Sequence, residues 1–102
     1  MAQTATIGRF VHYKLGEWDA EAINRRRKDA LITSSALERN GHQVHVGNQA
    51  EAGQVYPALI VRVWPLGELA QLQVFLDGND TFWATSVTEG EGERQYTWPT
   101  RN

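Results

Sequence analysis

The stretch VYPALIVRVW, residues 55 to 64, decides the fold because it is the strongest β-strand pattern in this chain of 102 residues. Its β-branched and aromatic residues favour an extended backbone, in which alternate side chains point to opposite faces. One face is expected to carry Leu59, Val61 and Val63, and the other Ile60, Arg62 and Trp64. Pro57 has no N–H to donate, so the first part of this strand should lie at an edge or a bulge.

Further strand patterns occur on both sides of this stretch. They are residues 7–13 (IGRFVHY), 69–76 (LAQLQVFL), 81–87 (TFWATSV) and a last short edge strand at 96–99 (YTWP), with another suggested by Val44 and Val46. The tight-turn sequence Asp77-Gly78-Asn79-Asp80 predicts a hairpin between two of them. Together they predict a mainly β (α+β) protein, folded as a small five- to six-stranded antiparallel barrel or bent sheet.

Residues 17 to 40 contain no Gly or Pro and predict a mainly helical insertion after the first strand. Asp19 is suited to cap its N-terminus, and Asn40-Gly41 to stop it. Poor helix formers at 32–35 predict a break, followed by a second short helix. An apolar stripe should dock on the barrel or on a neighbouring subunit; it comprises Ile23, Arg26, Ala30 and Leu31. Residues 1–102 are expected to form one domain.

The strand faces also predict one contiguous hydrophobic core. It comprises Val61, Val63, Trp64, Val74, Leu76 and Trp83, with Phe75 as a further residue that fills the barrel. Replacing Val61 or Val74 by Asp should then unfold the domain, because an unpaired buried carboxylate costs several kcal/mol.

Composition excludes several classes of protein. Ten basic and twelve acidic residues leave a formal net charge of −2, which argues against a general nucleic-acid binder. The absence of cysteine excludes disulfides, thiol catalysis and zinc sites of the Cys type. The longest apolar run, residues 58–61, is far shorter than the ~20 residues of a membrane span. No signal-peptide pattern opens the chain, so we expect a cytoplasmic protein without a membrane partner.

The residues offer little for catalysis or metal binding. His42 and His45 are three apart, which on a strand puts them on opposite faces, and His12 lies in another strand. The glycine and distal glutamate of a calcium loop are missing after Asp77, so a hairpin turn accounts better for that segment. No nucleophile motif is present, and the acidic residues at 89–93 fit a solvated loop. We therefore expect no enzyme activity, no cofactor and no metal.

The run Arg25-Arg26-Arg27-Lys28 is the most informative polar feature. Four consecutive residues of a helix sweep through about 300°, so these cations cannot all face bulk water. Arg26 or Arg27 should lie near the stripe that contacts the barrel, where a guanidinium needs a carboxylate or a phosphate. Two interpretations remain open at this point: an ion pair within the chain, or an anion pocket that accepts a phosphate or an acidic partner surface.

Ten aromatic residues, four of them Trp, are the second informative feature. Phe82 and Trp83 are neighbours on one strand, so one of them should point away from the core, and Tyr96 and Trp98 share one face. Exposed rings could stack a base or form a subunit contact. The candidate ligand-binding residues are therefore Asn24, Arg25, Arg26, Arg27, Asn79, Phe82, Trp83, Tyr96 and Trp98, with the two Asn side chains facing a base edge.

Most of the chain resembles a widespread group of small bacteriophage and prophage proteins. The similar segments are IGRFVHY (7–13), AINRRR (22–27), HVGN (45–48), AGQVYPALIVRVW (52–64), LQVFLDGNDTFWATS (72–86) and the terminal WP (98–99). The resemblance implies a viral origin and expression inside an infected bacterium. It supplies no catalytic residues.

Two classes of function suit a small phage protein of this composition. The first is a non-catalytic binder that sequesters a phosphorylated nucleotide-type ligand, as an anti-defence protein would. The alternative is a virion structural component, such as a capsid-decorating or connector protein, located in the virion. A thin core and four tryptophans also predict a homo-oligomer, most simply a dimer.

Overall fold

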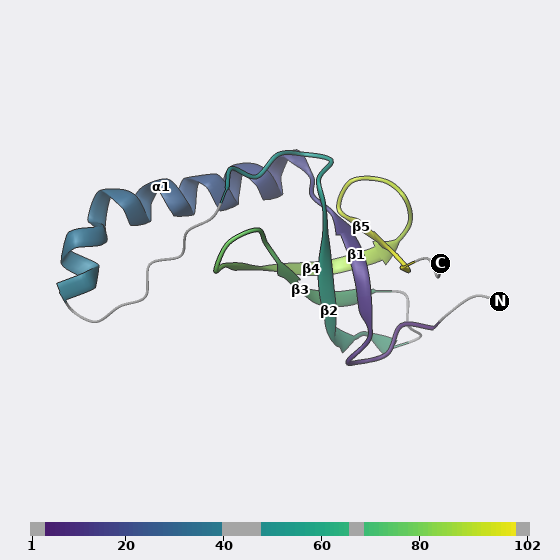
Figure 1. Ribbon diagram of the computed structural model, residues 1–102. Coiled ribbons are helices and arrows are strands. Elements are labelled where there is room, and N and C mark those ends of the chain that lie inside the picture. Colours follow the sequence, from purple (N-terminus) through teal and green to yellow (C-terminus); the bar gives the residue numbers. More distant parts are fainter. Residues whose placement is uncertain (1–3, 40–47, 66–68, 100–102) are drawn as a thin grey trace.

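A computed structural model describes residues 4–39, 48–65 and 69–99 of the chain. It is mainly β: five strands close into a barrel, and one helix follows the first strand (Figure 1). In chain order the elements are β1 (Phe10–Lys14), α1 (Glu17–Arg39), β2 (Val55–Val63), β3 (Ala70–Phe75), β4 (Thr81–Glu89) and β5 (Gln95–Thr97). The predicted small barrel with a helical insertion is confirmed. The expectations for His42, Val44, His45 and Val46 lie outside the described residues.

The strands pair in the order β1-β2-β3-β4-β5, and β5 returns to β1. All ladders are antiparallel, as predicted, except the parallel one between β4 and β5, which joins Thr88 to Gln95 and Glu89 to Tyr96. The prediction of an edge strand at 96–99 is wrong, because Tyr96 also pairs with Tyr13 of β1 and so closes the barrel. Pro57 lies where β2 pairs with β1 and the ladder to β3 has not yet begun, which agrees with its missing N–H.

A bulge in β2 changes which side chains enter the core. The register with β3 shifts between Ile60 and Arg62, so Ile60 is buried and both Val61 and Arg62 are exposed. The predicted faces of this strand are therefore wrong at Val61, which is 36% exposed. Alternation from the buried Ala58 and Ile60 already places Val61 outside, so the prediction chose the wrong face for the core. The extra residue of the bulge then keeps Arg62 outside as well and returns Val63 to the half-buried side.

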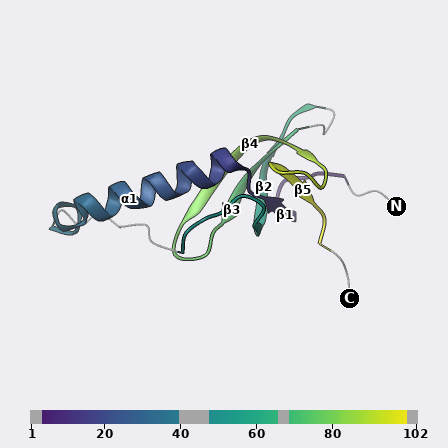
Figure 2. The same ribbon diagram turned by 90° about the horizontal axis from the view of Figure 1, so that it is seen from above.

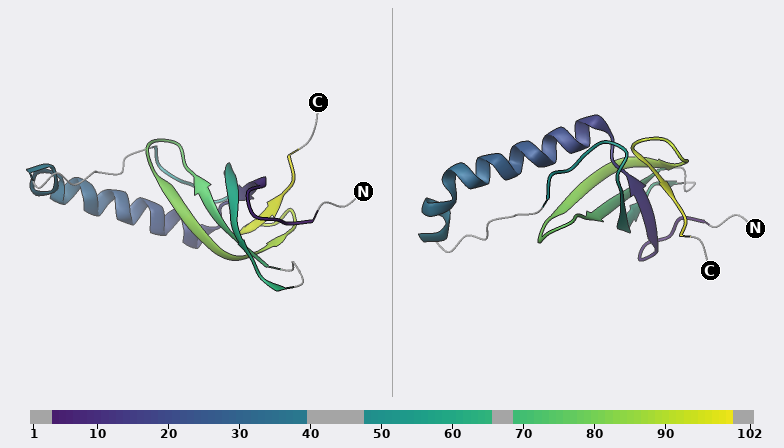
Figure 3. Two further views of the ribbon diagram at one scale, coloured as in Figure 1. Left: turned by 90° about the horizontal axis from the view of Figure 1, so that it is seen from below. Right: turned by 45° about the horizontal axis from the view of Figure 1, so that its top comes forward.

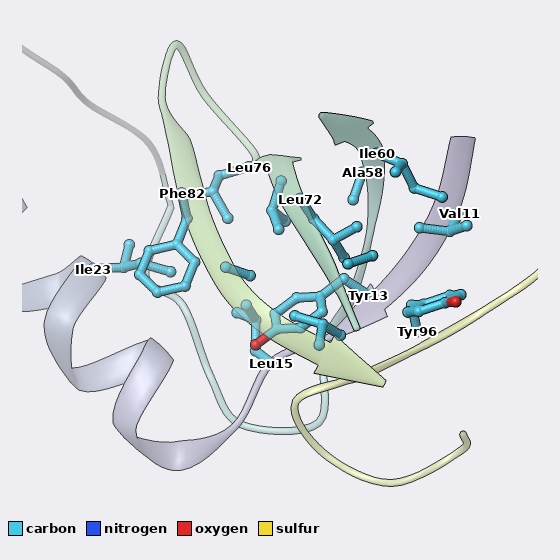
Figure 4. Close-up of a cluster of buried hydrophobic side chains, with 14 of the residues drawn as sticks. Val11, Tyr13, Leu15, Ile23, Ala58, Ile60, Leu72, Leu76, Phe82 and Tyr96 are labelled. Atoms are coloured by element: carbon cyan, nitrogen blue, oxygen red, sulfur yellow. The ribbon is translucent and has the colours of Figure 1, made fainter. Parts of the chain in front are cut away.

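The core is built from smaller residues than the sequence predicted. Val74 and Leu76 are buried as expected, and Val63 and Trp64 are half-buried, but Phe75 and Trp83 are exposed. Instead, inward-facing positions of all five strands fill the barrel together with Ile23 of α1 (Figure 4). The buried hydrophobic residues of the strands are Val11, Tyr13, Ala58, Ile60, Ala70, Leu72, Val74, Phe82, Ala84, Val87 and Tyr96.

The helix begins at Gly16, whose carbonyl accepts a hydrogen bond from the N–H of Ala20. The prediction that Asp19 is the N-cap residue is wrong, because Gly16 occupies that position. Asp19 lies in the first turn, and its Oδ2 accepts the N–H of Gly16 at 2.9 Å, which is the reciprocal half of a capping box. The predicted break at 32–35 is also wrong, because α1 is continuous over 23 residues; serine and threonine weaken a helix but do not break it.

The first turns of α1 cover one end of the barrel, and the remainder of the helix extends away from it (Figure 1, Figure 2, Figure 3). Ala20 and Ile23 are buried in this contact, and Ile23 points toward the ring of Phe82 (Figure 4). The predicted docking of the helix on the barrel therefore holds at Ile23. The side chains of Ala30 and Leu31 lie outside the described residues.

Candidate functional site

Two members of the arginine run are held by the chain itself. Arg27 is buried, with its Nε 3.6 Å from Asp80 Oδ2 and its other nitrogens donating to the carbonyls of Asn48 and Asp77. Arg26 donates to the same carboxylate oxygen and, at 3.0 Å, to the carbonyl of Thr81. Both guanidiniums thus hold α1 against the β3–β4 hairpin. For Arg26 and Arg27 the structure therefore shows the first of the two interpretations, an ion pair within the chain. Arg25 is exposed.

The two predicted asparagines lie in different surroundings. The amide of Asn24 makes two hydrogen bonds with the backbone of Ala50, donating to its carbonyl at 2.8 Å and accepting its N–H at 2.9 Å. It therefore holds the segment before β2 against the helix. Asn79 is exposed in the hairpin turn, where Gly78 has a φ of 121° and the predicted turn is confirmed.

Tyr96 and Trp98 form a second group at the closing strand. Tyr96 is buried and meets the Trp98 ring edge-on, with the ring centres 5.9 Å apart. The Trp98 Nε1 donates to Glu89 Oε1 at 3.2 Å, and the Arg9 guanidinium lies over the Trp98 ring at 5.1 Å. Burial, and then the Glu89 charge, raise the pKa of Tyr96. These contacts give both rings a role in closing the barrel.

Phe82 and Trp83 line a pocket of about 260 Å³ between the start of α1 and β4. We call it the aromatic pocket; its residues are Trp18, Asp19, Phe82, Trp83, Ala84, Thr85 and Arg94. Phe82 faces inward and meets the Trp18 ring edge-on at 6.4 Å, whereas Trp18 and Trp83 are 61% and 57% exposed. The expectation that one of the two neighbours on β4 points away from the core is confirmed, and it is Trp83.

A bulge in β4 shapes one wall of the aromatic pocket. Between the pairs Ala70–Val87 and Leu72–Ala84, β4 advances three residues while β3 advances two. Ser86, with a φ of 54°, lies in the extra step next to the lining residues. Bulges bend a strand and re-aim its side chains, and they are frequent beside binding sites.

Asp19 and Arg94 form the polar floor of the aromatic pocket. Asp19 is 1% exposed, and its Oδ2 accepts the Tyr13 hydroxyl at 2.6 Å and the Gly16 N–H. Its other oxygen, Oδ1, lies 3.5 Å from Arg94 Nε and accepts no hydrogen bond from the residues that the structure describes. Burial, followed by the hydrogen bond and negative charge of Asp19, raises the pKa of Tyr13 far above its ordinary value of about 10.

Arginines cover three of the four tryptophan rings. Arg94 lies 5.4 Å from the ring centre of Trp18, and equivalent pairs join Arg9 to Trp98 and Arg62 to Trp64. No arginine in the described ranges lies over the ring of Trp83. A cation over an indole face satisfies the ring electrostatically. Trp83 thus combines a 57% exposed side chain with a ring over which no arginine of the described side chains lies.

A second, larger depression of about 490 Å³ lies on the outer surface of β1 and β5. It is lined by His12, Lys14, Val55, Gly90, Glu91, Gln95 and Thr97. The Lys14 ammonium already donates to the Glu91 carbonyl at 2.7 Å. Among its lining residues the imidazole of His12 is the single aromatic ring, so the depression offers less stacking surface than the two indoles and the phenyl ring of the aromatic pocket.

Sequence reasoning identified Phe82 and Trp83 but missed Trp18, Asp19 and Arg94 as their companions in the aromatic pocket. The missed residues come from a helix start and a glycine-rich loop, and no periodic pattern connects those segments to β4. The signal in the sequence that could have indicated them was the adjacent pair Trp18 and Asp19, which puts an indole next to a carboxylate. Asp19 was assigned to helix capping alone.

Three further observations bear on the class of protein. Within residues 4–39, 48–65 and 69–99, no cluster of three or more metal-ligating side chains occurs. The described residues also include no helix with the length and apolar character of a membrane span. Comparisons with protein-family models, with curated proteins and with solved structures find no match. The geometry of the chain itself therefore carries the functional argument.

Proposed function

We propose that this chain is a non-catalytic binding protein that holds a phosphorylated nucleotide-type ligand in the aromatic pocket. The observation that carries the proposal is the convergence of open indole surface and a half-exposed guanidinium at one pocket. Trp83 supplies an uncovered ring face, and Arg94, with a side chain 53% exposed, supplies a cation. Stacking and charge-assisted phosphate contacts are the two interactions by which proteins hold nucleotides without sequence readout.

The size of the aromatic pocket fits part of a nucleotide. Its volume of about 260 Å³ lies just below the roughly 300–1,000 Å³ of sites for drug-sized ligands. A single ring system can enter, and the phosphate then remains at the mouth. Arg94 belongs to the loop between β4 and β5 and lines the pocket with a half-exposed side chain, so its guanidinium can contact that phosphate.

The free energies of the expected contacts show that micromolar binding needs several groups together. Stacking of a base contributes about 1–3 kcal/mol, and a hydrogen bond to a charged group about 1.5–3 kcal/mol. Neither alone reaches the ~8 kcal/mol of a micromolar complex, so both groups and further hydrogen bonds are required. In the cytoplasm of a phage-infected bacterium, such a protein would act by sequestering a nucleotide signal, which is the anti-defence role that we propose.

Calorimetric titration against cyclic and linear adenine and guanine nucleotides tests this proposal. Trp83→Ala and Arg94→Ala should each weaken binding at least tenfold without loss of the folded circular dichroism spectrum. Arg25→Ala is the matched control for Arg94→Ala, since it removes an exposed arginine outside the aromatic pocket. No heat from any nucleotide, with folded protein in the cell, would overturn the proposal.

A second candidate, a virion structural component, is favoured by one surface feature. Ile7, Phe10, Val61 and Phe75 are exposed, and the rings of Phe10 and Phe75 lie 6.2 Å apart on the outside of the barrel. We call these four residues the outer apolar strip. Exposed apolar surface of this kind suits contact with another protein or a second copy. Mass spectrometry of purified virions beside infected-cell lysate separates the two candidates, because a sequestering protein should be absent from the particles.

A further inference from the structure

One oxygen atom in the floor of the aromatic pocket is buried without a hydrogen-bond donor. Asp19 Oδ1 has no such partner among the described residues, although Asp19 is 1% exposed and its Oδ2 accepts two hydrogen bonds. Buried carboxylate oxygens are normally satisfied, so an exception calls for an explanation in terms of function. Asp19 and Arg94 both line the aromatic pocket, so a ligand there can reach this acceptor once the Arg94 guanidinium moves aside.

The group nearest to this oxygen shows what chemistry the site accepts. The planar guanidinium of Arg94 approaches Oδ1 at 3.5 Å through Nε, too far for a hydrogen bond, and lies 5.4 Å from the ring centre of Trp18. A flat group with parallel N–H donors thus rests beside an indole and faces a carboxylate. Half of the Arg94 side chain is exposed, so it can leave this position without unpacking the core.

We propose that Asp19 reads a guanine-type base edge, and that a guanine nucleotide displaces Arg94 from it. This inference rests on the nucleotide-binding function proposed above. The N1–H and N2–H donors of guanine present the same parallel pair as a guanidinium, and Asp19 Oδ1, whose lone pairs are unused, accepts them. The base stacks against the exposed indole of Trp83. Arg94, released from Asp19, then contacts the phosphate.

The same geometry disfavours adenine. The Watson–Crick edge of adenine has one donor group beside an acceptor nitrogen, so a carboxylate facing that edge meets a lone pair. A site built around hydrogen bonds to a ligand discriminates strongly against analogues that lack the matching donors. Inosine retains the N1–H donor and lacks the N2 amino group, which makes it an intermediate case.

The experiment is calorimetric titration of the unmodified protein with GMP, IMP, AMP and N-acetylarginine amide. We expect GMP to bind at least tenfold tighter than IMP and at least a hundredfold tighter than AMP. Equal binding of AMP and GMP would overturn the assignment of Asp19 and leave the proposed nucleotide function standing. Binding of no nucleotide would overturn both, and binding of N-acetylarginine amide alone would show that the pocket reads an arginine side chain of a protein.

Two variants test the role of Arg94 and Asp19 separately. In Arg94→Ala, guanosine should bind at least as tightly as in the unmodified protein because the competing guanidinium is gone, whereas the advantage of GMP over guanosine should fall to near unity. Asp19→Asn keeps an oxygen for Tyr13 and Gly16 and should abolish the preference for GMP over AMP. Should this variant fail to fold, the ligand series above decides the question without it. A preference for guanine that survives in folded Asp19→Asn would overturn the proposal.

Discussion

Replacing Asp80 by Asn tests how the helix is held on the barrel. The Asp80 side chain is 2% exposed, and its Oδ2 faces both Arg26 and Arg27, while Oδ1 accepts the N–H of Thr81 at 2.8 Å. Asparagine has the same size and can keep the bond to Thr81. The change therefore removes the buried negative charge and keeps the size of the side chain.

The expected cost follows from the burial of Arg27. Its side chain is 9% exposed, and its Nε donates no hydrogen bond to the described residues. Leaving a buried charge without its counter-charge costs about 3–5 kcal/mol. Because the carbonyls of Asn48 and Asp77 still accept from Arg27, we expect a loss near the lower end, about 3 kcal/mol. Arg26→Ala, at a half-exposed side chain, should cost less than about 1 kcal/mol.

Urea unfolding followed by circular dichroism measures both losses. With a slope of about 2 kcal/mol/M, Asp80→Asn should lower the midpoint by about 1.5 M. Adding Arg27→Met to Asp80→Asn should restore part of the stability, because the unpaired charge is then gone. An Asp80→Asn variant as stable as Arg26→Ala would refute the reasoning. So would a double variant whose loss of stability equals the sum of the Asp80→Asn and Arg27→Met losses.

Further tests concern the core, the buried Tyr13 and self-association. Val74→Asp should unfold the domain, whereas Val61→Asp, at a residue 36% exposed, should keep the folded spectrum; equal damage would contradict the outward position of Val61. The raised pKa of Tyr13 means that the unfolded chain loses the phenol proton first, so stability should fall as pH rises above about 10. Tyr13→Phe should flatten this alkaline decrease in the urea midpoint, and an unchanged slope would refute the assignment. We expect light scattering at micromolar concentration to give about twice 11.5 kDa, and Phe10→Ser with Phe75→Ser to give a monomer. A monomer before substitution would contradict the dimer.

The strand pattern of this chain could be predicted because local residue types specify it. β2, β3 and β4 each begin and end within two residues of the predicted ranges. The hairpin at Asp77–Asp80 also follows from local turn chemistry. What failed was the assignment of side chains to faces. The face that carries Ala58 and Ile60 points inward, which places Val61 outside, and the bulge between Ile60 and Arg62 returns Val63 to the half-buried side.

The closure of the barrel could not be derived in the same way. Tyr96 joins β5 to both β1 and β4. Its partner in β1, Tyr13, is more than 80 residues away in the sequence, and its partner in β4, Glu89, is seven residues away. Strand propensity carries no information about which strands pair. The mistaken edge strand at 96–99 is the result of that gap, and Trp83 was placed in the core for a related reason, since hydrophobicity alone does not distinguish the two faces of β4.

The arginine run and Arg94 show why a concentration of charge in a sequence does not locate the charge that a ligand can use. Four consecutive cations on a helix packed against a barrel force at least one of them inward, and a buried guanidinium must then find a carboxylate of the same chain. Arg27 finds Asp80, and Arg26 joins it. Arg94 is isolated in sequence, with a φ of 61° that turns the loop toward the start of α1, and its guanidinium stays half-exposed over Trp18. The contact of Arg94 with Asp19 is long, at 3.5 Å, so a ligand that offers Asp19 better donors can displace Arg94. The buried Arg27 could not be displaced from Asp80 in this way.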